Sequence, residues 1–379
     1  MEVQIPLREL INVVTLAQAL IFAGVLLISR FRQYQANRIL IVSFVIIATV
    51  KIDQLFQILG GVEAFPGFAF IFIPVQWLLT PSLYFYVAAR IDGEFKFTRK
   101  QLWHLLPALA SLAYLSATYY FLPLAGKVAY LESGQLQNPV NALVIPLASD
   151  LIQLGYLVAA QRRLADYGVT LRNWFSRVDD EDVVWLRRVI TIWMVIFLGH
   201  MLFTVSLRIF GWYGFALAVL DGLNIAHLLM VNALMMLAVV GQFTVLSPVP
   251  RLESKQKYAA SGTTSEARRA LFDRVRLDMQ EHAHYLEMDL TLGELAAAIG
   301  AAPRDLSEAI NGEGGITFYD FVNSYRVAAA RQLLLDEPNE KVLSVAYQSG
   351  FNSKSTFNKA FKAETGQSPS EFRKTHQTA

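Results

Sequence analysis

Apolar residues are distributed unevenly along the 379-residue chain, and their distribution divides it into two parts. Up to about residue 243, long apolar runs alternate with short polar segments. Because roughly 20 apolar helical residues cross a bilayer, these runs predict transmembrane helices. The seven predicted spans cover about residues 10–29, 39–59, 68–89, 102–122, 142–160, 189–207 and 215–240. For residues 1–243 the fold class predicted is therefore an all-α, seven-helix transmembrane bundle.

Lys and Arg are concentrated in alternate loops between these spans. The first, third and fifth loops contain Arg30, Arg32, Arg38; Arg90, Lys96, Arg99, Lys100; and Arg162, Arg163, Arg172, Arg177, Arg187, Arg188. The second loop has no basic residue, the fourth has only Lys127 and the sixth has only Arg208. Basic loops stay in the cytoplasm. We therefore expect a multi-pass protein of the bacterial inner membrane, with its N-terminus outside and its C-terminal part in the cytoplasm.

A short pattern occurs twice in the C-terminal part, about fifty residues apart. The first copy consists of Leu295, Ala296, Gly300, Leu306, Ile310, Gly315 and Thr317, and the second of Val345, Ala346, Gly350, Phe357, Phe361, Gly366 and Ser368. Each copy predicts a helix, a glycine turn and a second helix, because the small Ala lets two helices cross closely and Gly allows positive φ. Two such units in tandem indicate a soluble helix-turn-helix domain that reads DNA.

Polar segments and capping patterns set the predicted boundaries of this domain. A Pro-, Ser- and charge-rich stretch predicts a linker over residues 244–264, and a helix restarts near Ser265 with Leu271, Val275 and Met279 on one face. Capping boxes are expected at Thr291–Glu294, Thr317–Asp320 and Ser368–Glu371. A long helix is predicted over residues 318–335. The expected domains are 1–243, the transmembrane part; 244–264, the linker; and 265–379, the DNA-binding part.

Composition narrows the chemistry. The chain is 54% hydrophobic, and the apolar excess lies upstream of about residue 250. It contains no cysteine, which excludes disulfides, thiolate zinc sites and cysteine nucleophiles. Walker, Rossmann, nucleophile-elbow and zincin motifs are absent from the sequence. We therefore expect neither an enzyme nor a cofactor.

Residues 290–374 closely resemble the tandem helix-turn-helix domain of AraC/XylS-type transcriptional regulators. The most specific stretch is residues 350–373, which follows the family signature almost position for position. The first unit departs from the general pattern at Ala309-Ile310-Asn311, and with Phe318, Phe321, Asn323, Tyr325 and Arg326 it is similar to the branch fused to multi-spanning membrane segments. The resemblance implies a domain of seven α-helices that presents two recognition helices to successive major grooves.

By this resemblance the recognition helices cover about residues 303–310 and 353–361. The positions expected to face DNA are Arg304, Ser307, Glu308, Lys354, Ser355, Thr356 and Lys359. Residues 290–313 carry a net charge of −3, whereas residues 341–374 carry +4. Because phosphate contacts need positive charge, the second unit is predicted to be the stronger DNA anchor. The first unit either reads bases, for instance through Arg304 and Glu308, or serves mainly as scaffold.

Ionisable residues within the predicted spans are costly in lipid and usually face the bundle interior. They are Lys51, Asp53, Asp150, His200, Asp221 and His227, with Lys51 and Asp150 as a candidate pair. They indicate a ligand- or proton-sensing pocket, or alternatively polar contacts that hold helices together. No metal site is expected: His200 and His227 lack a metal-ligand spacing, and the spacing of His282 and His284 does not place them on one helix face.

These patterns predict a one-component transcription regulator that senses an extracytoplasmic or membrane signal and binds promoter DNA in the cytoplasm. The expected partners are double-stranded promoter DNA, the lipid bilayer and an unidentified small-molecule or physical signal. A homodimer is also expected, and RNA polymerase is a possible partner. The alternative is a membrane transporter or enzyme whose helix-turn-helix domain is regulatory or has become a protein-interaction module.

Overall fold

In a computed structural model, the described residues are 7–28, 34–92, 95–135, 138–177, 181–210, 222, 224–226, 228–236 and 264–377. Within these ranges every regular element is helical, and the β-type pairing found is an isolated antiparallel bridge between Phe175 and Thr291. The predicted all-α class is thus confirmed for this part of the chain. The chain divides into two compact units, the first Met1–Ala165 with Glu181–Pro248 and the second Asp166–Asp180 with Val249–Ala379.

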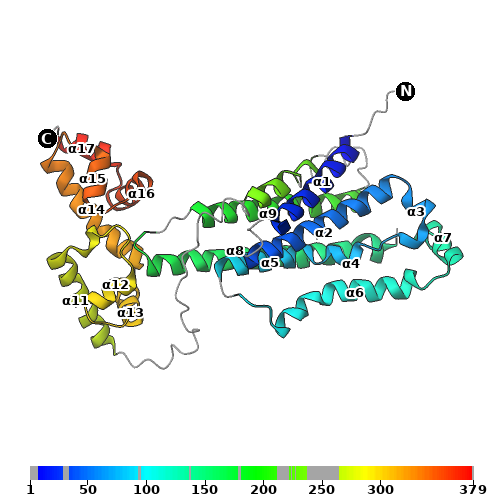
Figure 1. The fold of residues 1–379 in the computed structure, drawn as a ribbon, viewed down its shortest axis with the longest axis horizontal. Helices are drawn as coiled ribbons and strands as arrows, with labels where there is room; N and C mark the ends of the chain where they lie inside the picture. Colours follow the sequence, from blue (N-terminus) through cyan, green and yellow to red (C-terminus); the bar gives the residue numbers. More distant parts are fainter. Residues whose placement is uncertain are drawn as a thin grey trace. The chain divides into compact units, whose positions relative to one another are not determined.

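The first unit is a bundle of helices (Figure 1). Its elements are α1 (Leu7–Ile28), α2 (Gln35–Ile58), α3 (Gly61–Ala64), η2 (Pro66–Phe68), α4 (Ile73–Gln76), α5 (Leu79–Ile91), η3 (Arg99–Leu105), α6 (Leu106–Leu115), η4 (Ser116–Tyr120), α7 (Leu124–Glu132), η6 (Val140–Val144), α8 (Ile145–Trp174) and α9 (Glu181–Phe210). The helix α2 packs against α1 and α5. Ser43 on α2 and Ser82 on α5 share a buried hydrogen bond of 2.7 Å, so polar contacts as well as apolar ones join these helices.

Three helical segments in the described ranges are long and apolar enough to cross a membrane: Glu9–Ile28, Gln35–Ile58 and Pro66–Ile91. The pair Arg99–Tyr120 and Leu124–Glu132 meets the same criterion only when taken together, and it bends by 101°. These four segments coincide with the first four predicted spans. The fifth and sixth predicted spans lie on α8 and α9, which are not among the candidates, and α8 carries Asp150, Arg162 and Arg163. Seven spans therefore stay a prediction.

The seventh predicted span lies only partly in the described ranges, where Asn224–Met236 is a shorter apolar helix. Residues 244–263 of the predicted linker lie outside the described residues, as do Asp221, His227 and the side chain of His200.

The second unit contains seven α-helices in its described part, the number implied by the family resemblance. They are α11 (Ser265–His282), α12 (Leu292–Ala298), α13 (Pro303–Glu313), α14 (Phe318–Asp336), α15 (Val342–Gln348), α16 (Lys354–Thr365) and α17 (Pro369–Gln377), with η8 (His284–Leu286) after α11. The long helix α14 contributes to two apolar clusters, one with α11, α12 and α13 and the other with α15, α16 and α17. Each cluster forms the core of one helix-turn-helix unit.

Local signals in the sequence explain these helices. Thr291, Thr317 and Ser368 accept hydrogen bonds from the backbone N–H three residues later, as predicted. The helix α11 begins after Thr264 and buries Val275 and Met279, which confirms the predicted restart near Ser265. All four glycines of the repeated pattern, Gly300, Gly315, Gly350 and Gly366, have positive φ. The pattern therefore marked the turns correctly.

Candidate nucleic-acid interface

The two predicted recognition helices are α13 and α16 (Figure 1). Each buries one face in the core of its own helix-turn-helix unit. Leu306, Ala309 and Ile310 of α13 are fully buried, as are Phe357 and Phe361 of α16. Both helices continue beyond the predicted ends, to Glu313 and Thr365. Because the apolar stripes are buried, the polar positions between them remain at the surface and can meet a ligand.

On α13 the polar positions interact with one another. Arg304 Nε donates to Glu308 Oε1 at 3.1 Å, an ion pair one turn apart. Asn311 Nδ2 donates to the Ser307 hydroxyl oxygen at 3.1 Å and to the Ser307 carbonyl oxygen at 2.8 Å. All three predicted DNA-facing residues of this helix are half-buried. The Arg304 charge is thus largely balanced by Glu308, which favours base contacts or a scaffold role over phosphate binding.

On α16 the predicted positions are more open. Lys354, Ser355 and Lys359 are exposed and Thr356 is half-buried. The Ser353 hydroxyl caps the helix by accepting from the Thr356 N–H at 3.2 Å, and it donates to the Thr356 hydroxyl oxygen at 2.8 Å. The cap fixes the start of the helix beside Lys354, where a phosphate would also meet the helix N-terminus.

The two helix-turn-helix units meet where the turn before α16 contacts η8. A Cβ atom at Gly350 would lie 2.4 Å from the carbonyl oxygen of Tyr285 and 2.9 Å from the Cα atom of Leu286. The same Tyr285 carbonyl accepts a hydrogen bond of 2.7 Å from Arg326 Nε on α14. This contact fixes the turn at Gly350 against the first helix-turn-helix unit. It therefore fixes the spacing of the two recognition helices.

Residues 174–177, which we call the anchor segment, belong to the second unit although α8 begins in the first. Trp174 lies in the apolar cluster of α11 to α14, and Phe175 forms the bridge to Thr291. Ser176 is fully buried, and its backbone N–H and its hydroxyl both donate to the Leu290 carbonyl, at 3.1 and 2.6 Å. Arg177 forms an exposed ion pair with Asp289 at 2.9 Å. The last residue of α8 and the three residues that follow it thus contribute to the fold of the second unit.

Arg326 holds the anchor segment in place. Its side chain is 1% exposed, and it donates to the Ser176 carbonyl oxygen at 3.3 Å and to the Ser176 hydroxyl oxygen at 3.2 Å. It also donates to the carbonyl oxygens of Glu287 and Met288, at 2.6 and 3.2 Å. Burial lowers the pKa of Arg326 to about 10, so the guanidinium is still charged at neutral pH. A buried charge of this kind is stable only while its acceptors are present, and Ser176 supplies two of them.

Sequence reasoning identified Arg326 through the family resemblance but missed Ser176. The predicted fifth loop carried the signal of its basic residues, but it also contains the adjacent large apolar side chains Trp174 and Phe175. An apolar side chain in a basic loop was the signal that this loop contributes to a core.

In the first unit, the predicted sensing residue Lys51 is 4% exposed and donates to three neutral amide oxygens. They belong to Asn12, Gln54 and Asn224, at 3.0, 2.9 and 3.1 Å. Asp53 is also buried and accepts from Gln57 at 2.8 Å and from Gln76 at 3.5 Å. The structure therefore brings Lys51 together with amides from three parts of the bundle, and the Lys51–Asp150 pair stays a prediction.

Comparison with known proteins gives matches in the C-terminal part of the chain. Residues 295–375 match a family model described as a helix-turn-helix domain. An uncharacterised HTH-type transcriptional regulator of Staphylococcus aureus strain COL is 34% identical over 90 residues, which cover 24% of this chain and 12% of that protein. The transcriptional activator NphR of a Rhodococcus species is 33% identical over 103 residues, which cover 27% of this chain and 30% of that protein.

One solved structure is also similar to part of the chain. It is the C-terminal domain of AraT, a response regulator from Geobacillus stearothermophilus, with 31% sequence identity and a TM-score of 0.26. The match covers 28% of this chain and 84% of that chain. The aligned segments cover only 12% and 30% of the two regulators' own lengths, so these similarities describe the C-terminal domain and not the rest of the chain. Residues 295–375 are an AraC-type helix-turn-helix domain, the DNA-binding domain of a class of transcriptional regulators that are not enzymes.

Proposed function

We propose that the protein is a membrane-embedded, one-component transcription regulator. In this proposal the first unit spans the cytoplasmic membrane and responds to a signal outside the cell or within the bilayer. The second unit binds promoter DNA in the cytoplasm. The observation that carries the proposal is that an AraC-type helix-turn-helix domain shares one chain with at least three helices apolar enough to cross a bilayer.

The distribution of charge supports the proposed orientation. The basic residues between the candidate spans lie in the first and third loops. Of the further basic residues, Arg177 belongs to the anchor segment and Arg172 lies just before it. A cytoplasmic position for these loops brings the anchor segment into the same compartment as the DNA-binding domain. The contacts of Ser176 with Leu290 and Arg326 support that part of the proposal.

The anchor segment supplies a route for the signal in this proposal. The helix α8 begins in the first unit, and its last residue, Trp174, lies in the core of the second. A change in the first unit that displaces α8 would therefore act on α12 and α14 directly, independently of the linker between residues 244 and 264. A ligand shifts such an equilibrium only by its differential affinity for the two states.

The test uses the full-length chain reconstituted in lipid nanodiscs, because a fragment limited to the DNA-binding part, residues 265–379, lacks Trp174 and Ser176. Binding sites are selected from random double-stranded DNA and then mapped by footprinting. We expect protection of about 20 base pairs, because two recognition helices reading successive major grooves span two helical turns. Sequence-independent binding only, or no DNA binding, would favour the alternative that the domain is a protein-interaction module of a transporter.

A further inference from the structure

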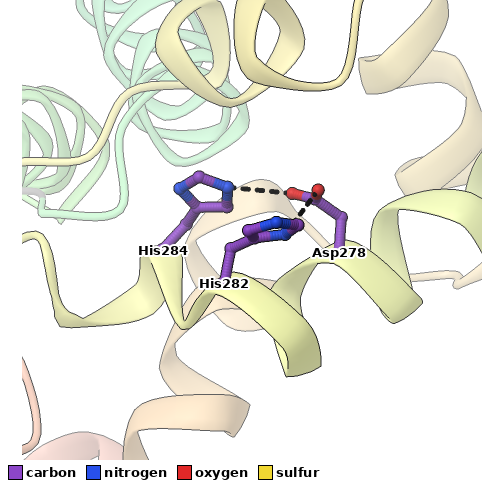
Figure 2. Close-up of side chains that lie close together, drawn as sticks. All are labelled: Asp278, His282 and His284. Atoms are coloured by element: carbon purple, nitrogen blue, oxygen red, sulfur yellow. Dashed lines mark ion pairs between the residues drawn. The ribbon is translucent and has the colours of Figure 1, made fainter.

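Three side chains with metal-ligating atoms meet at the end of α11 (Figure 2). Asp278 and His282 lie one turn apart on α11, and His284 is the first residue of η8. His282 Nδ1 lies 3.0 Å from Asp278 Oδ1, and His284 Nε2 lies 2.9 Å from Asp278 Oδ2. Figure 2 shows both rings on the same side of the Asp278 carboxylate, with a dashed line from each ring to it.

The backbone at Ala283 creates this arrangement. Two residues on a helix that are two positions apart point to different faces, which is why the sequence predicted no shared site. Ala283 instead adopts the left-handed conformation, with φ 49° and ψ 37°, and ends α11. The chain then turns back, and the two imidazole rings stack with their centroids 5.7 Å apart. The two histidines therefore lie close together although their spacing does not place them on one face of a regular helix.

The conformation of Ala283 is unusual for its residue type. Helices commonly end with a left-handed residue, but that residue is usually glycine, because a Cβ atom in this region costs about 1–2 kcal/mol. Among the described residues with positive φ, only Phe70 and Ala283 are not glycine. A strained backbone that brings three polar side chains together is the kind of feature that accompanies binding sites.

We propose that Asp278, His282 and His284 bind a divalent transition-metal ion of the zinc class. Two imidazoles and one carboxylate are a ligand set that zinc accepts, with one further position for water. Calcium and magnesium prefer ligand sets made of oxygen alone, so the imidazoles disfavour them. The ligand atoms all lie within 4.8 Å of one another. A small rotation of the exposed His282 side chain would bring them within reach of one ion with bonds of about 2.0–2.2 Å.

The surroundings allow an ion to enter. The side chain of His282 is 59% exposed, whereas those of His284 and Asp278 are 27% and 19% exposed. The site thus has one open side, where water can complete the coordination, and two ligands held against the protein.

A bound ion would connect α11 to η8 at the point where the two helix-turn-helix units meet. His284 precedes Tyr285, whose carbonyl accepts from Arg326 and faces the turn at Gly350. Residues 287 and 288, which follow η8, provide the carbonyl acceptors for the same guanidinium. The ion is therefore expected to stiffen the contact that sets the spacing of α13 and α16.

The experiment measures zinc binding to the full-length protein in detergent, purified with an affinity tag that contains no histidine and stripped with a chelator. Isothermal titration with Zn²⁺ should show one ion per chain, with a dissociation constant in the micromolar range or tighter. His284→Ala and His282→Ala should each weaken binding at least about 10- to 100-fold, since even outer-shell changes have effects of that size. His376→Ala, on α17 of the same unit, is the matched control and should bind like the parent.

Two further measurements separate a metal site from an ion pair. Co²⁺ should give visible ligand-field bands in the parent and in His376→Ala, and these bands should be lost in Asp278→Asn, whose helical content is checked by circular dichroism. Zn²⁺ should raise the unfolding temperature of the parent but not that of Asp278→Asn. Binding that survives the loss of His282 and His284, or no saturable binding by the folded parent, would show that the cluster is only an ion pair. The DNA-binding proposal would be unaffected by that result.

Discussion

At the scale of single residues, the repeated glycines have different roles although the sequence pattern treats them alike. Gly350 and Gly366 both have positive φ, at 87° and 76°. Only Gly350 is also confined, by the carbonyl of Tyr285, whereas a Cβ atom at Gly366 would meet nothing within 4 Å. One glycine thus satisfies a turn, and the other satisfies a turn and a close approach between two helix-turn-helix units.

We predict that Gly350→Ala destabilises the second unit much more than Gly366→Ala. The change at Gly366 should cost about 1–2 kcal/mol, the penalty for an L-residue in the left-handed region. The change at Gly350 adds a backbone clash that no side-chain rotation relieves. The stabilities of the two variants are compared by chemical denaturation of the full-length protein, with loss of DNA binding as the readout. Equal denaturation midpoints for both variants would mean that the two helix-turn-helix units are not in contact at this turn.

The charged residues of the two recognition helices also differ in their surroundings. Lys359 is exposed, and it lies in the second helix-turn-helix unit, which has a net positive charge. Arg304 is paired with Glu308, and it lies in the first helix-turn-helix unit, which has a net negative charge. We predict that Lys359→Ala weakens DNA binding at all sequences and lowers the slope of log affinity against log salt by about 1. Arg304→Ala should leave the slope nearly unchanged. Affinities measured between 50 and 200 mM salt test this ranking, and equal slopes for both variants would contradict it.

At the scale of secondary-structure elements, the most consequential contact joins the end of α8 to α12 and α14. Trp174 is 9% exposed and belongs to the same buried apolar cluster as Leu292 and Leu295. We predict that Trp174→Ala destabilises the second unit by about 3–5 kcal/mol, the usual range for a buried Trp truncated to Ala. Hydrogen exchange should show lost protection in α12 although the substitution lies in α8.

The matched control for this prediction is Trp185→Ala on α9, in the first unit, where the side chain is 38% exposed. It should leave protection of α12 unchanged. If Trp174→Ala also leaves α12 fully protected, the anchor segment is not part of the folded domain, and the proposed route through α8 fails.

Local sequence signals predicted the elements of the second unit well. The repeated pattern located both turns, and the capping boxes at Thr291, Thr317 and Ser368 located helix starts, because capping depends on residues three positions apart. The anchor segment and the histidine cluster were not predictable in the same way. Ser176 meets Leu290 across 114 positions of sequence, and the left-handed backbone of Ala283 has no residue signature.

The candidate DNA contacts could be named only through the family resemblance, since spacing alone does not say which helix face meets DNA. What the resemblance did not reveal is the pairing of Arg304 with Glu308, which depends on rotamers within α13. The long apolar runs predicted helices in the first unit, but apolar composition alone does not distinguish a straight span from the bent pair at residues 99–132.

At the scale of the whole molecule, the orientation in the membrane decides whether the DNA-binding proposal holds. We predict that a reporter fused after residue 240 is active only if it works in the cytoplasm, because the basic residues lie in alternate loops. Paired alkaline phosphatase and green fluorescent protein fusions at this junction measure it. The matched pair of fusions after Asn138, in the weakly basic fourth loop, should give the opposite result. Phosphatase activity at residue 240 would exclude both the topology and access to DNA.

The last prediction concerns how a signal in the first unit reaches the second. Lys51 donates to neutral amides from α1, α2 and Asn224, so its charge is balanced by dipoles and depends on all three positions being held together. Suppose that the bundle has a second state in which these amides move apart. Lys51 would then differ in free energy between the two states more than an apolar residue at this position would. We therefore predict that Lys51→Met shifts the balance of states and alters the induced response of a promoter reporter, at unchanged protein level.

Asp150→Asn and the double variant with Lys51→Met show whether the predicted pair acts as one group: a pair would make the double variant equal to either single one. Combining Lys51→Met with Ser176→Ala tests the proposed route through α8, because a weakened anchor segment should reduce the effect of Lys51→Met while the tethered domain still binds DNA.

If Lys51→Met and Asp150→Asn both respond like the parent, the sensing site lies elsewhere, for example in the groove of about 480 Å³ between α2, α5 and η3. A soluble fragment released on induction would show that the signal acts by proteolysis and not by transmission through α8.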